Sequence, residues 1–425
     1  MSYKSILQKI LAMMARATIR KHKPTIIGVT GSVGKTSARL AAFAVLKHKY
    51  RSATAEKNYN NEIGLPLAIL GMPHYGRNIF AWGVGLAMAV LKIYGLAKMI
   101  EYPEVLVLEY GVDRPGDMDV LVSIARPDIA MVTAIGDTPV HVEFFKNPES
   151  LIEEKSKLVT ALPAQGYAIL NHDDRVVYNM RSKTHARIIT FGRDAHADIK
   201  IANENPATSL SGMTFKLEYK GSTVPVRLDG LLGAPQVYAC SAGVALGIAM
   251  DMHLVEAVEA LRGYMPPPGR MRIIAGLRSS YILDDTYNAA PEAMRAALDT
   301  LRDLPAERKI AVLGDMRELG QYTEDAHRLI GRQAAACADM IFCVGEYAHY
   351  VADEAVACGF PRAKIFAVPD SLSAARALRP VVEKGDLILI KGSQSRRMEW
   401  TVEALMLHPE EAKDLLVRQE PHWKS

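Results

Sequence analysis

A short apolar run leads into a glycine-rich turn at Ile26-Ile27-Gly28-Val29-Thr30-Gly31-Ser32-Val33-Gly34-Lys35-Thr36-Ser37, and the residues that follow predict a helix. In such an arrangement the backbone N–H groups of the turn converge on phosphate oxygens, and the start of the helix adds the positive end of its dipole. The Lys35 ammonium neutralises phosphate charge, and the Thr36 hydroxyl suits Mg²⁺. The stretch therefore predicts a nucleotide-binding loop with contacts from Gly31, Ser32, Gly34, Lys35, Thr36 and Ser37.

The glycine spacing differs from the common P-loop pattern, because Val29 stands six residues before Lys35 where that pattern has glycine. The preceding strand, the Gly-Lys-Thr-Ser ending and the following helix all agree with phosphate binding. We therefore favour nucleotide binding over an ordinary turn between a strand and a helix.

Composition indicates a multidomain globular protein. The chain has 425 residues, 49% of them hydrophobic, and a net charge of +4. It is too long for a single typical core and too balanced in charge for a disordered chain. The small basic excess gives no argument for a nucleic-acid partner. The four cysteines have neither metal-ligand spacing nor the density of a secreted disulfide scaffold, which favours a reducing cytoplasm.

Two segments near the N-terminus combine apolar and basic residues. Residues 1–23 predict a basic amphipathic helix that either lies on an anionic membrane surface or packs on the next domain. Residues 79–100, within an apolar insertion at about 75–102, are long enough to be a membrane-span candidate. A single span would separate Lys35 from the later acidic residues, so we favour an interfacial helix or hairpin, or a homodimer surface. Burial of this segment within the protein is the remaining alternative.

The middle of the chain alternates apolar strands with helical segments. Near-continuous apolar runs at 105–108, 129–132, 168–170 and 188–191 predict a parallel sheet covered on both faces. Runs at 213–219 and 223–226 predict an antiparallel hairpin, and 241–250 predicts a closing helix. We therefore expect an α/β domain with a P-loop and a mostly parallel sheet over residues 24–268.

A linker is predicted at Met265-Pro266-Pro267-Pro268-Gly269-Arg270, because stacked prolines stiffen the chain and glycine frees it. Beyond it, strands at 280–283, 309–313, 340–344, 365–368 and 387–390 alternate with helices. This pattern predicts a second, Rossmann-like α/β domain over residues 269–408. We expect the charged tail, residues 409–425, to be loosely held.

Polar residues follow several predicted strands of the first domain. Glu109 comes at the strand end where ligands bind in parallel α/β sheets, and is a candidate Mg²⁺ ligand beside Thr36. His141 follows the next strand and could contact metal or phosphate, and Lys155 lies on the predicted helix 150–158. Taken alone, a histidine or a helical lysine of this kind is more often an ordinary surface residue.

Two further groups carry polar side chains toward a possible site. The amide-rich loop Asn58-Tyr59-Asn60-Asn61-Glu62 can contact a polar ligand, although clustered asparagines also simply make turns. In the second domain, strand ends bring one set of residues to a common edge of the sheet, namely Asp285, Asn288, Asp315, Lys391 and Ser393.

Taken together, the motifs resemble the Mur ligase family, and most closely its MurF branch. They are ordered as in that family between about Thr25 and Leu405. The matching stretches are 28–37, Asn58 to Pro66, Glu109-Tyr110-Gly111, Glu154-Lys155, Asp284-Asp285-Thr286-Tyr287-Asn288-Ala289-Ala290-Pro291, Leu313-Gly314-Asp315-Met316-Arg317-Glu318-Leu319-Gly320 and Lys391-Gly392-Ser393.

The resemblance implies an ATP-dependent amide ligase of peptidoglycan precursor synthesis. The γ-phosphate of ATP would pass to a carboxylate of a muramoyl peptide, and the amine of D-alanyl-D-alanine would displace phosphate from the resulting acylphosphate. This agrees with elementary chemistry, since a carboxylate needs a better leaving group to acylate an amine, and phosphoryl transfer needs cations on spread negative charge.

Residue roles also follow from the resemblance. Lys35 and Thr36 would hold the phosphates and the first Mg²⁺, Glu109 would ligate Mg²⁺, and His141 would assist at a second metal. Lys155 matches the lysine that is typically carbamylated in this family, which turns a cation into a metal-binding carboxylate.

On the C-terminal side, the resemblance implies that Asn288 and Asp315 hold adenine and ribose. Arg270 would reach phosphate from the linker, and Lys391 would approach the dipeptide or the acylphosphate. The candidate substrate contacts are Asn58, Asn60, Asn61, Tyr287 and Ser393.

Three features depart from the family pattern. Only residues 1–24 precede the first strand of the phosphate loop, where the family has a domain that grips the UDP part of the precursor. The insertion at 79–100 is extra, and Gly233-Ala234-Pro235-Gln236 stands where the family has Gly-x-His-Asn. These departures leave the donor substrate open.

We therefore expect a cytoplasmic ligase, either free or attached to the inner face of the membrane or dimerised through 79–100. The alternatives are a related ligase for another carboxylate and amino acid, and a nucleotide-gated scaffold that has lost ligation. Intact Glu109, His141 and Lys155 argue against the scaffold, because a pure binder needs no second metal centre.

Overall fold

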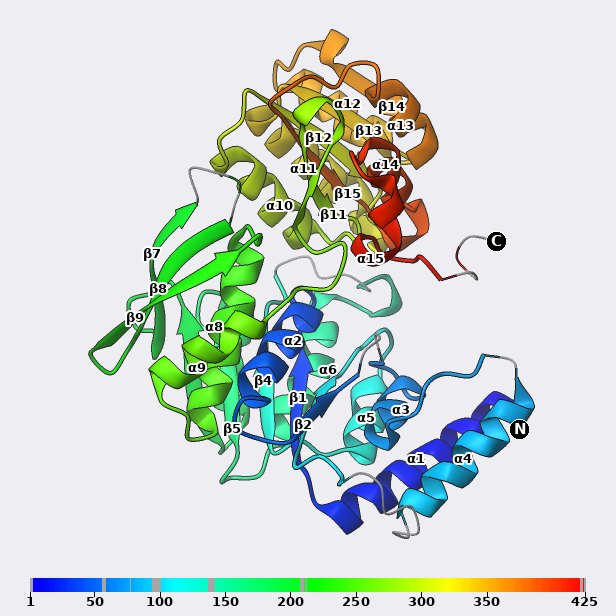
Figure 1. The fold of residues 1–425 in the computed structure, drawn as a ribbon, viewed down its shortest axis with the longest axis vertical. Helices are drawn as coiled ribbons and strands as arrows, with labels where there is room; N and C mark the ends of the chain where they lie inside the picture. The colour runs from blue at the N-terminus through cyan, green and yellow to red at the C-terminus, as the bar shows by residue number, and fades with distance from the viewer. Residues whose placement is uncertain are drawn as a thin grey trace.

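The computed structural model describes residues 3–55, 59–76, 78–93, 101–136, 142–206, 210, 212–420 and 423. Within these residues the chain forms two α/β units that lie one above the other, with the N-terminal unit at the bottom of Figure 1. Some of the sequence-based predictions concern residues outside the described ranges, namely Asn58, His141 and residues 94–100 of the insertion.

The first unit is built on a large mixed sheet whose described strands run in the order β2-β3-β1-β4-β5-β6-β7-β8-β9. Neighbours from β2 to β7 are parallel, and β7, β8 and β9 form an antiparallel meander. The predicted parallel sheet and hairpin are therefore confirmed. The strand bounds are β1 (Thr25–Thr30), β2 (Ser52–Thr54), β3 (Val105–Glu109), β4 (Ile129–Val132), β5 (Tyr167–Asn171), β6 (Arg187–Gly192), β7 (Ile199–Pro206), β8 (Gly212–Tyr219) and β9 (Ser222–Asp229).

Both faces of the parallel part are covered by helices, which explains its continuous apolar strands. In β1, Ile27 and Val29 belong to the core beneath α2 (Lys35–Leu46), α8 (Ala234–Ala249) and α9 (Leu254–Ala260). Ile26 lies in a second core on the opposite face. That face is covered by α3 (Gly64–Leu70), α5 (Asp117–Ile124), α6 (Pro148–Thr160) and α7 (Arg175–Asn179).

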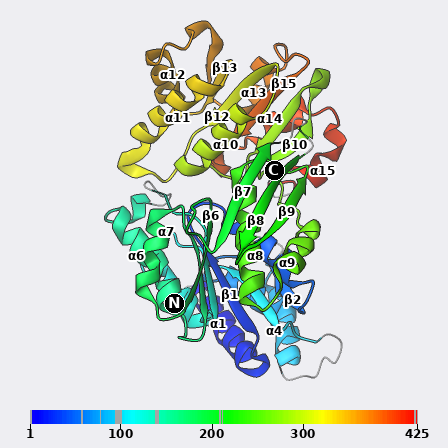
Figure 2. The same ribbon diagram turned by 90° about the vertical axis from the view of Figure 1, so that its left-hand side faces the viewer.

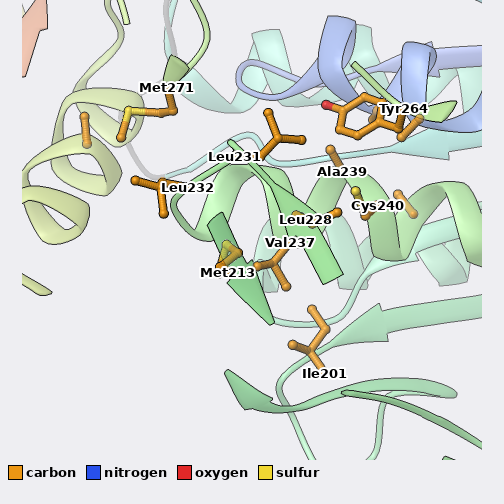
Figure 3. Close-up of a cluster of buried hydrophobic side chains, with 14 of the residues drawn as sticks. Ile201, Met213, Leu228, Leu231, Leu232, Val237, Ala239, Cys240, Tyr264 and Met271 are labelled. Atoms are coloured by element: carbon orange, nitrogen blue, oxygen red, sulfur yellow. The ribbon is translucent and has the colours of Figure 1, made fainter. Parts of the chain in front are cut away.

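The antiparallel meander packs on α8 and continues the first core toward the linker. Figure 3 shows Met213 and Leu228 of the meander beside Val237 of α8. Leu232 and Met271 extend the same buried cluster to the start of the second unit. The two units are thus joined by buried apolar contacts as well as by the proline-rich linker.

The second unit contains a sheet with described strand order β10-β11-β15-β12-β13-β14, parallel except for β10. Its strands are β10 (Arg272–Ala275), β11 (Tyr281–Asp285), β12 (Arg308–Gly314), β13 (Met340–Val344), β14 (Ile365–Val368) and β15 (Asp386–Lys391). One face carries α10 (Pro291–Asp303), α11 (Thr323–Cys337) and α12 (Ala348–Ala357). The other carries α13 (Ser371–Leu378), α14 (Glu399–Leu405) and α15 (Ala412–Leu415), so the predicted α/β fold of this part is confirmed.

The N-terminal residues and the insertion come together as two neighbouring helices. α1 (Tyr3–His22) lies beside α4 (Ile79–Ile93), at the end of the molecule away from the second unit (Figures 1 and 2). Leu11 and Met14 of α1 and Trp82 of α4 share a small core with α3. Among the residues that the structure describes, none of the helices combines the length and apolarity needed to cross a bilayer.

The C-terminal tail differs from the expectation of a loosely held segment. Leu416, Val417 and Arg418 are buried against the second unit. The Arg418 guanidinium donates to the carbonyl oxygens of Thr286, at 2.8 Å, and Tyr287, at 3.1 Å. The prediction of a loosely held tail relied on its charged composition. It was wrong because an arginine that donates to backbone carbonyl oxygens can be buried.

Candidate active site

The glycine-rich turn forms a tight loop between β1 and α2. Gly31 has φ +146°, and a Cβ there would lie 2.2 Å from Thr133 Oγ1, so only glycine fits without movement. Backbone N–H groups of Ser32 and Val33 donate to the carbonyl oxygen of Ala134, at 2.6 and 3.1 Å. The loop is thereby fixed against the end of β4.

Lys35 bends back over this loop. Its Nζ donates to the carbonyl oxygens of Gly31, at 2.8 Å, and Ser32, at 3.4 Å. Burial lowers the pKa of Lys35, Glu109 opposes that change and Arg270 adds to it. Ser32 Oγ is buried and has no hydrogen-bond partner among the described residues. A phosphate group fits this loop, because its oxygens would accept from Ser32 Oγ and neutralise the half-buried Lys35 ammonium.

Glu109 lies at the end of β3 and is almost completely buried. Its Oε2 accepts from Thr36 Oγ1 at 3.0 Å and lies 3.5 Å from Arg39 Nε, and its Oε1 accepts from Asn60 Nδ2 at 3.2 Å. The predicted neighbourhood of Thr36 and Glu109 is therefore present. Arg39 was not predicted as a site residue, because in the sequence it looks like an ordinary helix residue and only the fold buries it.

The donor set fits Mg²⁺ that is shared with a nucleotide. Thr36 and Glu109 offer a hydroxyl and a carboxylate, and Mg²⁺ typically takes one or two carboxylates with phosphate oxygens and water. Within the described ranges no three His, Cys, Asp or Glu side chains gather into a metal-binding cluster. The predicted contribution of His141 falls outside those ranges and stays a prediction.

Lys155 reaches the same loop from α6. Its Nζ donates to the carbonyl oxygen of Gly31 at 3.2 Å, and its side chain is 1% exposed. Burial, together with the neighbouring Lys35 cation, lowers the pKa of Lys155 to about 7, against the opposing effects of Asp113 and Glu154. A large share of neutral amine at physiological pH makes this lysine a nucleophile as well as a cation.

The second unit presents Lys391 at the tip of β15. Its Nζ lies 2.6 Å from Asp285 Oδ2 and donates to the carbonyl oxygen of Asn288 at 2.8 Å. Burial lowers the pKa of Lys391 although Asp285 opposes the change. The Arg270 guanidinium lies 4.2 Å from the centre of the Tyr287 ring and lowers the pKa of both Lys391 and Lys35. The linker arginine thus lies within electrostatic reach of a lysine from each unit.

Gln236 occupies the place where the sequence departs from the Gly-x-His-Asn pattern. Its side chain is 1% exposed, donates to the carbonyl oxygen of Arg270 at 2.9 Å and accepts from Tyr264 Oη at 2.7 Å. This departure therefore supplies a contact that ties α8 to the linker.

A cleft of about 990 Å³ opens beside the phosphate loop, between the two units. Gly34 and Thr133 line it from the loop side, and one side of α10, from Glu292 to Asp303, lines it from the second unit. Asn171, Asp173 and Tyr238 also line it, and Tyr238 Oη donates to Asp173 Oδ2 at 2.5 Å. None of these three residues was predicted, although Asn171 at the end of β5 and Asp173 just after it show the same pattern of a strand that ends in polar residues as β3 and Glu109.

Asp315 and Ser393 form a fixed loop contact at the sheet edge of the second unit. The Asp315 carboxylate accepts from the backbone N–H groups of Glu346 and Tyr347, both at 3.0 Å, and Ser393 Oγ accepts from the N–H of Arg317 at 3.0 Å. Neither Asp315 nor Asn288 lines the cleft. Their predicted contacts with ribose and adenine stay predictions.

Comparison with known proteins identifies the family. Residues 90–247 match the Mur ligase middle domain, and residues 269–394 match the Mur ligase, glutamate ligase domain. The UDP-N-acetylmuramoyl-tripeptide–D-alanyl-D-alanine ligase of Mycobacterium tuberculosis (strain ATCC 25618 / H37Rv) is 30% identical over 405 residues, which cover 90% of this chain and 73% of that protein. The chain belongs to the Mur ligase family.

Other relatives agree with this assignment. The Bacillus subtilis (strain 168) ligase of the same name is 28% identical over 94% of this chain and 79% of its own length. MurF from Thermotoga maritima in complex with ADP superposes with a TM-score of 0.76 at 26% identity, covering 93% of this chain and 83% of that one. MurF from Acinetobacter baumannii has a TM-score of 0.78 at 23% identity, with 93% and 79% covered, and supports the fold alone.

As a Mur ligase, the protein is an ATP-dependent ligase that uses ATP and Mg²⁺. The site described above can hold both, because the first turn of α2 offers backbone N–H groups and Lys35 offers its ammonium to phosphate, while Thr36 and Glu109 offer oxygens to a cation. The predicted ligase class, cofactors and α/β fold are thus confirmed.

Proposed function

We propose that this Mur ligase joins D-alanyl-D-alanine to the tripeptide carboxylate of a UDP-muramoyl peptide. The main support for the proposal is structural: Lys35, Lys155 and the Thr36–Glu109 pair all lie at the phosphate loop. In addition, the relatives of this chain are named for that reaction. The tripeptide carboxylate of the muramoyl peptide would enter between this loop and Lys391 of the second unit.

The residues of the chain perform the phosphoryl transfer by positioning and charge. The loop N–H groups and Lys35 hold the β- and γ-phosphates, and Arg270 approaches them from the linker, so charge that spreads over the transferring group meets fixed cations. Bound Mg²⁺ supplies further neutralisation of that charge beside Thr36 and Glu109. The donor carboxylate oxygen attacks the γ-phosphorus, ADP leaves, and the amine then attacks the acyl carbon and expels phosphate.

We assign Lys155 the carbamylated role implied by the family resemblance. Its neutral Nζ would attack the carbon of CO₂, forming an N–C bond and releasing one proton, and would thereby present two carboxylate oxygens near Gly31. The low pKa of Lys155, about 7, supports this role, since only the unprotonated amine reacts. Exchange into ¹³C-bicarbonate followed by carbon NMR should give one carbamate signal that is absent in Lys155→Met.

The adenosine part of ATP fits the cleft that begins at Gly34. We propose contacts with Asn171 and Tyr238 in the present arrangement of the two units. Asn288 and Asp315 would reach the nucleotide only when the second unit rotates about the Pro266–Arg270 linker. Such closure would also exclude water from the acylphosphate.

The remaining site assignments concern the substrates and the second metal. Asn58, Asn61, Tyr287 and Ser393 would contact donor or acceptor, and His141 would assist at a second metal ion. Asn60 is already bonded to Glu109, which supports a role in orienting that carboxylate rather than in free substrate contact.

The protein's location is part of the proposal. We place the enzyme in the cytoplasm, on the inner face of the membrane, because α1 and α4 expose apolar side chains and α1 also exposes basic ones. Homodimerisation through the same helices is the competing arrangement.

Phosphate release from ATP by the purified protein tests this function. We expect release with UDP-muramoyl-tripeptide to depend on added D-alanyl-D-alanine, and the product to be heavier by the added dipeptide less water. Turnover with another carboxylate and amino acid would instead assign a related ligase. Binding of ATP without turnover on any such pair would assign the nucleotide-gated scaffold.

A further inference from the structure

The described part of α4 exposes an unusual number of large apolar side chains. Phe80 and Ile79 are 82% and 70% exposed, and Val84, Met88, Val90 and Leu91 are between 39% and 49% exposed. Phe80, Val84, Met88 and Leu91 are three or four residues apart, so they share one face of the helix. Ile6 and Met13 of α1 are also exposed, and we call these eight residues the α1–α4 surface.

The other side of α4 is firmly attached, so this exposure belongs to a folded helix. Trp82 is 3% exposed, and its Nε1 donates to the carbonyl oxygen of Gly76 at 3.1 Å. The Tyr75 ring meets the Trp82 ring edge-on at 5.4 Å, and Leu7 and Leu11 of α1 pack in the same core. The α1–α4 surface is therefore presented rigidly.

The charged residues of both helices have one sign. The acidic residues of the chain begin only at Glu56, and residues 79–93 contain none. In the described part of α1, Lys9, Arg20 and Lys21 are exposed and Arg16 is half-buried. Glu62 of the next loop accepts from Gln8 at 2.8 Å and borders α1. An apolar face flanked by lysines and arginines is complementary to a leaflet that contains anionic lipids.

We propose that the α1–α4 surface docks in the plane of an anionic phospholipid leaflet. The side of α4 that carries Trp82 packs on α1 and α3, so only the opposite face of the helix is available to lipid. α4 would therefore lie along the interface, with its apolar side chains at the boundary between headgroups and acyl chains.

A second copy of the chain is a less suitable occupant. In a twofold contact the same patch meets itself, so the basic residues of the two copies would face each other. Like charges across an interface oppose association, whereas anionic headgroups attract the same residues. The surface also lies at the end of the first unit away from the second, so the cleft stays open to solvent when the protein is docked (Figures 1 and 2).

Vesicle sedimentation of the full chain tests the proposal. We expect binding to vesicles of phosphatidylcholine with about one-third phosphatidylglycerol, and at least tenfold weaker binding to phosphatidylcholine alone. Phe80→Ser/Val84→Ser/Met88→Ser should weaken binding to the anionic vesicles at least tenfold. Lys9→Gln/Arg16→Gln/Arg20→Gln should weaken it similarly and remove most of its salt dependence.

Leu329→Ser/Val356→Ser provides the matched control, because these two exposed apolar residues lie on α11 and α12 of the second unit. It should bind vesicles as the wild type does. Unchanged ATP binding by every variant would show that each is folded. Failure of the wild type to bind anionic vesicles, or equal binding by the Phe80 triple variant, would overturn the proposal. A wild-type dimer that ignores vesicles and dissociates in that variant would assign the surface to a second copy.

Discussion

Lys155 on α6 donates a hydrogen bond to the carbonyl oxygen of Gly31 in the phosphate loop, at 3.2 Å. A buried ammonium thus lies against the backbone that is expected to hold ATP phosphates, with Lys35 as its neighbour. This arrangement costs stability while Lys155 is protonated, and it relates stability to pH.

The first prediction concerns Lys155→Met in CO₂-free buffer. The pKa of Lys155 is about 7 in the folded protein and 10.5 in the unfolded chain. The cost of the buried charge is therefore complete below pH 7 and disappears as pH rises from 7 to 10.5, where the unfolded chain binds more protons. At about 1.4 kcal/mol per pKa unit, Lys155→Met should be more stable than wild type by a few kcal/mol at pH 6.5, and the difference should shrink toward pH 10.

Urea unfolding at pH 6.5, 8 and 9.5 measures this difference. Lys157→Met is the control, because Lys157 is partly exposed and paired with Asp119 and Glu154. It should not gain stability at low pH. A difference between Lys155→Met and wild type that does not change with pH would contradict the low pKa.

The second prediction concerns the buried Glu109–Arg39 pair. Glu109→Gln should leave the Arg39 charge without its partner and lower the unfolding free energy by about 3 kcal/mol. Arg39→Met should have a similar cost, and the double variant should lose much less than the sum. Glu109→Gln should also lower kcat/KM at least a hundredfold. Measuring activity against Mg²⁺ concentration distinguishes a loss of Mg²⁺ binding from a loss of folded protein. Additive stability losses would show that the two charges do not interact.

The fold could be predicted where burial leaves a clear pattern in the sequence. β4, β13 and β14 were predicted to the residue, because each is a short apolar run bounded by polar, glycine or proline residues. β2 and β10 were missed, since they have three and four residues and are only partly buried. A short strand at a sheet edge carries too few apolar residues to be distinguished from a loop.

The site could be predicted only where a residue stands in a recognisable motif. Lys35, Thr36 and Glu109 were found in this way, and the structure brings them together. Arg39 was missed because its burial depends on β2, which was not predicted, and on β3, which is distant in the sequence. Tyr238 was missed for the same reason, since its helix meets Asp173 only in the folded sheet.

The third prediction concerns Gly31→Ala. A Cβ at φ +146° would lie 2.2 Å from Thr133 Oγ1 and 3.0 Å from the carbonyl oxygen of Ala134. We expect the loop to distort, with at least a tenfold loss of ATP affinity and a stability loss of about 1–3 kcal/mol. Gly116→Ala is matched for positive φ, +91°, but has open space around its Cβ, so it should lose about 1 kcal/mol and bind ATP normally. Calorimetric titration would show the difference, and equal ATP affinity in both variants would contradict it.

The fourth prediction concerns Arg418→Ala in the tail. Arg418 donates to the carbonyl oxygens of Thr286 and Tyr287, so its removal leaves buried acceptors and should lower the unfolding free energy by about 2 kcal/mol. Lys413→Ala, at an exposed tail position, should change stability by less than about 0.5 kcal/mol. Equal melting temperatures for the two variants would restore the expectation of a loosely held tail.

Oxygen transfer tests the central claim, that this Mur ligase activates a carboxylate as an acylphosphate. UDP-muramoyl-tripeptide labelled with ¹⁸O in its terminal carboxylate would be incubated with ATP, Mg²⁺ and D-alanyl-D-alanine. The masses of the phosphate and peptide products would then be measured by mass spectrometry. The account predicts one ¹⁸O in each phosphate released and a product extended by the dipeptide. Unlabelled phosphate, released without extension of the peptide, would contradict it.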